Sequence, residues 1–255
     1  MVDQLKAVIF DVDGTLAETE RDGHRVAFNQ AFVEMGFDWV WDEILYGKLL
    51  AVAGGKERII YYLRTFNPSF SYQGSLAVLV DNIYAAKTRH YVALLNAQKI
   101  CLRFGVLRLI NDIRELGLRM AIATASSTEN VTTLIIQTLG SDVLDWFDII
   151  ATGDLALKKK PAPDIFYYCL AKLKLSAENC LVIEDSENGV KAAIAAGIST
   201  IVTFNDYTKG DDFTGAVAVF DHLGEPTQFC QQRAGISIVT PYITALDLKA
   251  IHAKE

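Results

Sequence analysis

Two aspartates with one residue between them, Asp11 and Asp13, are the first side chains along the sequence whose spacing could serve chemistry. They follow a short apolar run at residues 6–10, and Gly14 comes next, where the missing side chain lets the backbone turn sharply. At a strand end, such a pair can direct a carboxylate and a backbone carbonyl towards one cation. Because Asp-rich turns with glycine are common, the pair alone favours an ordinary turn.

Hydroxyl groups follow another apolar run, at residues 120–123. Thr124 ends that run, and Ala125 and Ser126 come directly after it, before a predicted helix. Hydroxyls and backbone N–H groups at such a place form an anion site, although clusters of serine and threonine are more often plain helix caps. By itself, this segment is weak evidence for a binding site.

A lysine-rich segment is stiffened by Pro161 and Pro163. Such a stretch is usually a solvated surface, and that is our interpretation of Lys158 and Lys159. Lys160 lies next to the first proline, and its role stays open between a surface lysine and an anion ligand.

Adjacent acids, Glu184 and Asp185, end a further apolar run at residues 181–183. Adjacent carboxylates at a buried strand end repel each other unless a cation is present. Taken singly, the pair is evenly balanced between a charged helix start and a metal site. All four features lie at the carboxyl ends of predicted strands, where open parallel sheets bind ligands. Together, in this order, they favour a functional site over separate structural roles.

Short apolar runs that alternate with helical patterns are the elements that must position these groups. The runs lie at residues 6–10, 120–124, 149–151, 181–183, 200–204 and 216–220. Helical patterns lie between them at residues 113–116, 131–139, 165–173 and 190–196. This alternation predicts an α/β fold with a Rossmann-like parallel sheet core and helices on both faces. The first turn lacks the GxGxxG pattern and carries two acids, which excludes a dinucleotide-binding protein.

The stretch at residues 18–96 departs from this alternation, because it carries helical patterns without a convincing strand. Its helical patterns lie at residues 28–35, 44–52, 59–63 and 76–94. We therefore expect an inserted all-helical cap domain at residues 18–96, and an α/β core built from residues 1–17 and 97–255. The tail beyond residue 224 has no informative pattern.

The composition limits the class of protein. With 51% hydrophobic and 22% charged residues in 255, the chain is that of a globular protein. A net charge of -7 argues against nucleic acid or an anionic membrane as the main partner. The four cysteines are too sparse for a disulfide framework, and no apolar run approaches a membrane span. Because the first predicted strand begins close to Met1, we expect no leader. We expect a cytoplasmic monomer, or one in the plastid stroma if the source is a plant or alga.

The four motifs together resemble the haloacid dehalogenase superfamily of phosphotransferases over nearly the whole chain. The resemblance implies an enzyme that works through an aspartyl phosphate and uses Mg²⁺ as its cofactor. Asp11 would be the nucleophile, and Asp13 the general acid and base. Thr124 and Lys160 would bind the phosphoryl group that is transferred.

The same resemblance implies the ligands of the metal. Asp11, the backbone carbonyl of Asp13 and Asp185 would hold Mg²⁺, with Glu184 beside or behind them. Oxygen ligands of this kind are those that Mg²⁺ prefers. A carboxylate nucleophile needs such a charge beside it, because a phosphate dianion otherwise repels it.

Four segments of the predicted cap and one of the predicted core sharpen the resemblance. Residues 19–25, 28–29, 54–58, 86–88 and 221–226 look like those of the CbbY-type phosphatases. That group includes the xylulose-1,5-bisphosphate phosphatases, which remove an inhibitory by-product of Rubisco. The resemblance implies a small-molecule sugar bisphosphate as substrate, most closely xylulose 1,5-bisphosphate, and a role in supporting carbon fixation.

Substrate choice is expected to come from the cap. The turn at Gly54 and Gly55, with Lys56 and Arg58, could bind a second phosphate, or it could be a helix cap followed by a solvated helix start. Lys87 continues an apolar stripe, so its amine either reaches out to solvent or points into a closed cleft. The other predicted substrate-binding residues are Glu18, His24, Ala125 and Ser126.

Two alternatives to a phosphatase remain at this point. A β-phosphoglucomutase-like sugar phosphomutase would use the same core motifs and keep the phosphoenzyme long enough for its substrate to turn around. A non-catalytic binding or regulatory protein could share the fold. The complete set of acids and lysine counts against this second alternative, because a protein without catalytic activity does not need clustered acids.

Overall fold

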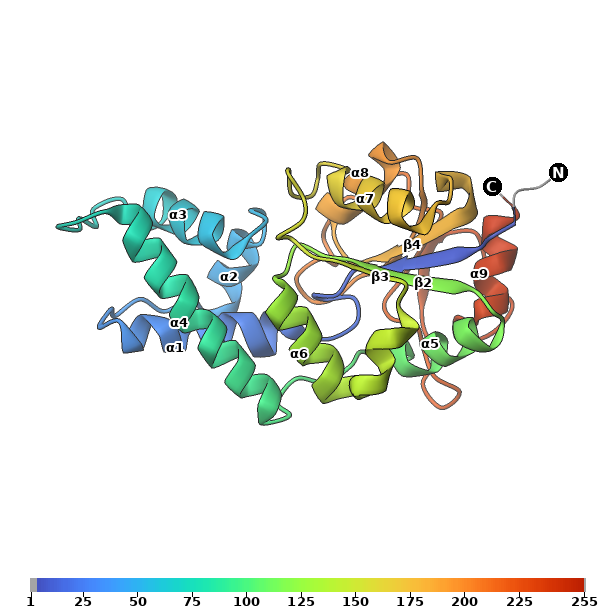
Figure 1. The fold of residues 1–255 in the computed structure, drawn as a ribbon, viewed down its shortest axis with the longest axis horizontal. Helices are drawn as coiled ribbons and strands as arrows, with labels where there is room; N and C mark the ends of the chain where they lie inside the picture. The colour runs from blue at the N-terminus through green and yellow to red at the C-terminus, as the bar shows by residue number, and fades with distance from the viewer. Residues whose placement is uncertain (1–3, 255) are drawn as a thin grey trace.

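The computed structural model describes residues 4–254, which contain one seven-stranded sheet with the helices α1–α4 (within residues 25–96) to one side of it (Figure 1). The strands follow the order β3-β2-β1-β4-β5-β6-β7, and every pair is parallel except the last. They are β1 (Ala7–Phe10), β2 (Arg119–Ala123), β3 (Ile149–Ala151), β4 (Cys180–Glu184), β5 (Ser199–Thr203), β6 (Ala218–Phe220) and β7 (Gln232–Gly235). The predicted α/β fold with a mostly parallel sheet is confirmed.

Helices cover both faces of the sheet, which explains why the central strand β1 is apolar at every position. Helices α7 and α8 pack on one face, and α5, α6 and α9 pack on the other (Figure 1). The bounds are α5 (Val106–Glu115), α6 (Thr128–Leu139), α7 (Asp164–Leu173), α8 (Glu187–Ala195) and α9 (Ala245–His252), with 3-10 turns at Ser141–Trp146 and Ala177–Asn179. The chain thus forms three layers.

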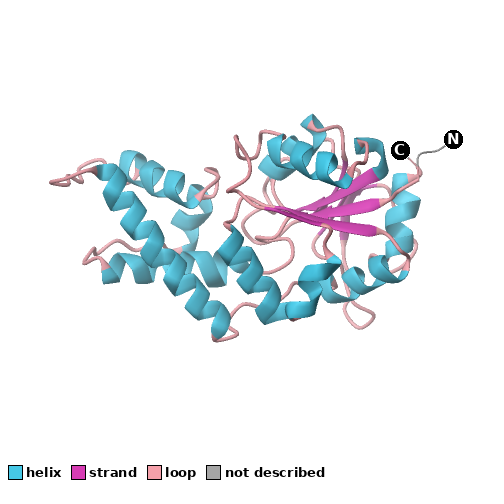
Figure 2. Ribbon diagram, viewed as in Figure 1, coloured by secondary structure: helices cyan, strands magenta, loops and turns pink. Residues whose placement is uncertain are grey.

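Residues 18–96 form helices and loops that lie beside the sheet, while every strand lies in the layered part (Figure 2). After a π-helical turn (Glu20–His24) come α1 (Arg25–Glu34), α2 (Glu43–Leu49), α3 (Gly55–Thr65) and α4 (Leu76–Asn96). Buried aromatic side chains hold these helices together, among them Phe28, Phe32 and Trp41. The domain limits stay a prediction, and the predicted core includes residues 1–3 and 255, which lie outside the described residues.

Arg103 fastens the segment that returns from the cap to the layered core. Its buried guanidinium donates to the carbonyl oxygens of Thr203 at 2.6 Å, Phe204 at 2.6 Å and Asp221 at 2.7 Å, and it also donates to that of Gly14. A guanidinium offers five N–H donors in a rigid fork, which suits this convergence of carbonyls. The loop that carries Asp13 and Gly14 is thereby tied to the ends of β5 and β6.

The tail beyond residue 224 completes the core with β7 and α9. Strand β7 is mostly exposed, so it lacks the apolar alternation that would have indicated a strand. Helix α9 begins with a capping box between Thr244 and Asp247 and buries Leu248 and Ile251 against the sheet. The signal for α9 was present in the sequence, but the segment before it is irregular.

Two expectations from the composition concern membrane-spanning helices and disulfides. None of the helices within residues 4–254 is both long and apolar enough to cross a lipid bilayer. The cysteines Cys101, Cys169, Cys180 and Cys230 are unpaired, as the sequence predicts.

We expect Leu248→Ala to lower the free energy of unfolding by about 2–5 kcal/mol, because it leaves a cavity under α9. Leu246, on the same helix, is 64% exposed, so Leu246→Ala should change the free energy of unfolding by less than about 0.5 kcal/mol. Urea denaturation of both variants measures the difference. Equal effects of the two substitutions would contradict the placement of α9 against the sheet.

Candidate active site

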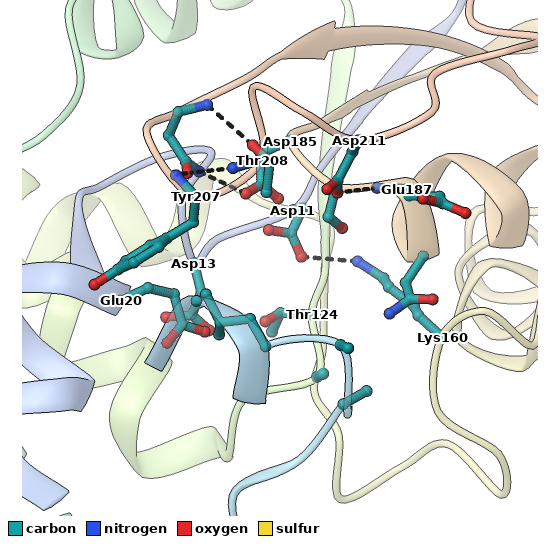
Figure 3. A pocket seen from close by; sticks show the side chains of 18 of the residues that line it. Asp11, Asp13, Glu20, Thr124, Lys160, Asp185, Glu187, Tyr207, Thr208 and Asp211 are labelled. Carbon is teal, nitrogen blue, oxygen red and sulfur yellow. Dashed lines mark hydrogen bonds and ion pairs between the residues drawn. The ribbon is translucent and has the colours of Figure 1, made fainter. Parts of the chain in front are cut away.

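Asp11 follows β1 and lies at the carboxyl edge of the sheet, between the ends of β2 and β4. Lys160 reaches it from the loop before α7, and its Nζ lies 2.7 Å from Oδ1 of Asp11 (Figure 3). The same Nζ lies 2.5 Å from Oε1 of Glu184. The same ammonium donates to the carbonyl oxygen of Ala123 at 2.8 Å. Lys160 is therefore buried and forms ion pairs with two acids. The alternative, a solvated surface lysine, is excluded.

Asp11, Glu184 and Asp185 form a buried cluster in which one oxygen of each acid lies within 4.8 Å of the others. Burial, with the repulsion of Glu184 and Asp13 added to it, raises the pKa of Asp11 to about 8 against the attraction of Lys160. Burial also raises the pKa of Asp185 well above its usual value, with Asp11 and Glu184 adding to the effect. Three acids against one lysine leave a charge that a cation would offset, and their hard oxygens fit Mg²⁺.

Asn205, which the sequence analysis did not single out, orients one acid of this cluster. Its Nδ2 donates to Oδ2 of Asp185 at 2.7 Å, and its Oδ1 accepts from the backbone N–H of Tyr207 at 2.9 Å and of Thr208 at 3.3 Å. The residue stands just after β5, so the rule that ligands meet at strand ends could have found it.

The side chain of Asp13 points away from the acid cluster and receives hydrogen bonds from three donors. Thr19 Oγ1 lies at 2.6 Å and His24 Nε2 at 2.9 Å from its Oδ1, and Ser126 Oγ lies at 2.5 Å from its Oδ2. Burial alone would raise the pKa of Asp13, but the attraction of His24 and these hydrogen bonds hold it well below its usual value. Asp13 is therefore an ionised acceptor here.

Lys87 continues this network from α4. Its Nζ lies 2.8 Å from Nδ1 of His24, and the side chain is 3% exposed, so it does not reach out to solvent. Burial lowers the pKa of Lys87 to about 8, against the attraction of Asp13 and Glu20. Of the two interpretations of Lys87 that the sequence left open, the structure agrees with the one that turns it inward.

Thr124 lies at the end of β2, where its backbone N–H donates to the carbonyl oxygen of Ala151 at 3.0 Å. Its buried Oγ1 accepts a hydrogen bond from the N–H of Ser126 at 3.1 Å. Thr124, Ala125 and Lys160 line the same cavity as Asp11, which brings the four predicted motifs to one place.

A cavity of about 420 Å³ separates these groups from the cap. Its cap side includes Arg58 and Glu20. The hydroxyl of Tyr46 connects these two side chains: it accepts a hydrogen bond from Arg58 Nη1 at 2.8 Å and donates one to Oε2 of Glu20 at 2.5 Å. Arg58 is one of the predicted substrate-binding residues, whereas Glu20 and Tyr46 are not, because only the tertiary fold brings these two to Arg58. A guanidinium therefore lies opposite Asp11 across the cavity.

The predicted substrate-binding residues divide into two groups. Those that line this cavity or a small cavity of about 60 Å³ beside it are His24, Gly54, Gly55, Arg58, Lys87, Ala125 and Ser126. Lys56 and Glu18 line neither of the two. Lys56 forms an exposed ion pair with Asp81 at 2.6 Å, and Glu18 pairs with Arg103 at 2.9 Å. The structure thus does not bring Lys56 or Glu18 to the acids.

Comparisons with known proteins agree with this geometry. A family model described as haloacid dehalogenase-like hydrolase matches residues 5–197. The fold and the site therefore define a hydrolase of the haloacid dehalogenase-like class.

Relatives place the chain more narrowly. Protein CbbY, plasmid, of Cupriavidus necator is 46% identical over 88% of this chain and 88% of its own length. The CBBY-like protein of Arabidopsis thaliana is 35% identical over 87% of this chain and 70% of its own. A crystal structure of a CbbY variant from Rhodobacter sphaeroides, in complex with xylulose-(1,5)bisphosphate, is 40% identical, covers 86% of this chain and 94% of that one, and has a TM-score of 0.78. The chain belongs to the CbbY family of haloacid dehalogenase-like hydrolases, and the prediction of an enzyme, a sugar-phosphate phosphatase, is confirmed.

We expect Asp11→Asn to keep the fold and to lower turnover by more than about 1,000-fold, because an amide is neither a nucleophile nor an anionic ligand. Phosphate release and circular dichroism of the purified variant measure both. Asp38→Asn, which changes an exposed acid of the cap, is the control and should keep wild-type turnover. Substantial turnover by the Asp11 variant would rule out Asp11 as the nucleophile.

Proposed function

We propose that this protein hydrolyses a sugar bisphosphate, most directly xylulose 1,5-bisphosphate, with Mg²⁺ as cofactor and a phosphoryl group held transiently on Asp11. The observation that carries the proposal is the position of Asp11, 2.7 Å from Lys160 and across a cavity from the Arg58 guanidinium. The xylulose bisphosphate bound by the Rhodobacter sphaeroides relative supports the same class of substrate. In this proposal, the enzyme supports Rubisco-based carbon fixation.

The transfer step follows from the charges around Asp11. An Oδ of Asp11 attacks phosphorus, the bond from phosphorus to the sugar oxygen breaks, and the sugar leaves as an alcohol once that oxygen gains a proton. Lys160 and Thr124 would contact the phosphoryl oxygens, so that positive charge and a hydroxyl offset the repulsion between two anions. Asp11, Asp185 and the carbonyl of Asp13 would hold Mg²⁺, with Glu184 behind, and the ion would supply further positive charge.

Asp13 would handle the protons. It protonates the leaving oxygen in the first step and takes a proton from the water that hydrolyses the aspartyl phosphate in the second. The three donors around Asp13 favour its ionised form, which suits the second step. For the first step the carboxyl must be protonated, as it is after the preceding hydrolysis.

The cap would bind the distal phosphate of the substrate. Arg58 is buried and lines the cavity, where its guanidinium lies 3.6 Å from Oε2 of Glu20. Its guanidinium can pair with phosphate oxygens through two N–H groups. A cation on the cap side of the cavity, with Asp11 on the core side, would select substrates that carry two phosphates.

Phosphate release from xylulose 1,5-bisphosphate, ribulose 1,5-bisphosphate, β-glucose 1-phosphate and phosphoglycolate tests the proposal. We expect xylulose 1,5-bisphosphate to give the highest kcat/KM, EDTA to abolish the activity and Mg²⁺ to restore it. Full activity in EDTA would contradict the cofactor, and isomerisation of β-glucose 1-phosphate without phosphate release would identify a mutase.

Arg58 and Lys56 provide a matched pair on the same helix turn. A charge-assisted contact to phosphate is worth about 1.5–3 kcal/mol, so Arg58→Ala should lower kcat/KM for the bisphosphate about 10- to 100-fold. Lys56→Ala should stay close to wild type, because Lys56 pairs with Asp81 at the surface. Kinetics with the bisphosphate and with a small monophosphate measure the effect. Equal losses on both substrates would mean that Arg58 supports the fold and does not bind the second phosphate.

A further inference from the structure

Lys159, which the sequence analysis interprets as a solvated surface lysine, makes a contact between the core and the cap. Its Nζ lies 2.6 Å from Oε1 of Glu57, in the first turn of α3. The two residues are 102 positions apart in the sequence, and their side chains are 33% and 48% exposed. The ion pair therefore joins the loop after β3 to the cap at the protein surface.

The backbone beside the pair leaves no room for another side chain. Gly54 has a φ of +95°, a value that favours glycine, and a Cβ added there would overlap the Glu57 carboxylate and the Lys159 ammonium. The turn that leads into α3 thus lies directly against the core lysine. Partial burial alone would raise the pKa of Glu57. The hydrogen bond from Lys159, a backbone hydrogen bond and the attraction of Lys159 and Lys56 together hold that pKa below its usual value.

The pair also connects two segments that serve the active site. Lys159 directly precedes Lys160, which donates to Asp11, and Glu57 directly precedes Arg58 on the opposite side of the cavity. Glu57 and Lys159 line a further cavity of about 550 Å³, which shares Lys160 with the main one. The contact consequently lies where the cap meets the core beside the site.

Other contacts between cap and core lie elsewhere around the cavity. Arg21 pairs with Asp206 at 3.2 Å, and the rings of Tyr46 and Tyr207 have centroids 5.9 Å apart. Those contacts involve the loop after β5. Among the salt bridges of the described residues, the pair of Glu57 and Lys159 is the one that joins the lysine-bearing loop to the cap.

We propose that Glu57 and Lys159 are positioning residues, which hold the cap closed so that Arg58 lies opposite Asp11 during the reaction. This inference rests on the proposed function for its kinetic part. Isolated surface ion pairs contribute little to stability, so the role is one of geometry. A cap that closes correctly brings the cation for the distal phosphate to its place and excludes water from the transfer step.

Charge reversal tests the pair, because it can be undone by a second reversal. Lys159→Glu and Glu57→Lys each replace attraction by repulsion, and each should lower kcat/KM for the bisphosphate about 10-fold. The double variant restores the pair with its charges exchanged and should return to within about threefold of wild type. Lys158→Glu is the matched control: it changes the net charge as Lys159→Glu does, but Lys158 forms no ion pair in the described part of the chain.

Small-angle X-ray scattering without substrate gives a readout that does not depend on the reaction. The two single reversals should increase the radius of gyration, and the double variant and Lys158→Glu should scatter like the wild type. This measurement tests the pair even if the panel of phosphate esters contradicts the proposed function. A double variant no better than the worse single variant, or single variants that scatter and react like the wild type, would overturn the proposal.

Discussion

The ammonium of Lys160 lies between two buried carboxylates, and the rest of the site depends on that contact. It stands 2.7 Å from Asp11 and 2.5 Å from Glu184, while a third acid, Asp185, belongs to the same cluster. One positive charge cannot offset three negative ones at low dielectric, so the acids must hold protons or share a cation. Burial, together with the neighbouring negative charges, raises the pKa of Asp11. The hard oxygens of this cluster suit Mg²⁺.

The sheet and the cap contribute charged groups to opposite sides of the cavity. Parallel strands end at one edge, where β1 and β4 bring Asp11 and Asp185 together without any distortion of the sheet. The cap adds Arg58 across the cavity, and the linker residue Arg103 ties the loop of the first motif to the core. In the proposed reaction, each side supplies one of the two phosphate sites of a bisphosphate.

The sequence was sufficient for the parts of the molecule in which local pattern and chemistry coincide. Strand ends with acids, a threonine and a lysine predicted the cluster around Asp11, and helical periodicity predicted the cap. Tyr46 and Glu20 were missed because only tertiary packing joins them to Arg58. Lys159 was interpreted as solvated because a lysine-rich run has the same pattern whether or not an acid from the cap lies opposite.

The central claim is that Asp11 carries the phosphoryl group during turnover. Rapid quenching of the enzyme with xylulose 1,5-bisphosphate, followed by borohydride reduction, converts an aspartyl phosphate to homoserine, which peptide mass spectrometry locates in the chain. The account predicts homoserine in place of Asp11 and at no other aspartate. Homoserine at a different position, or unmodified aspartates throughout the chain in enzyme quenched during turnover, would contradict it.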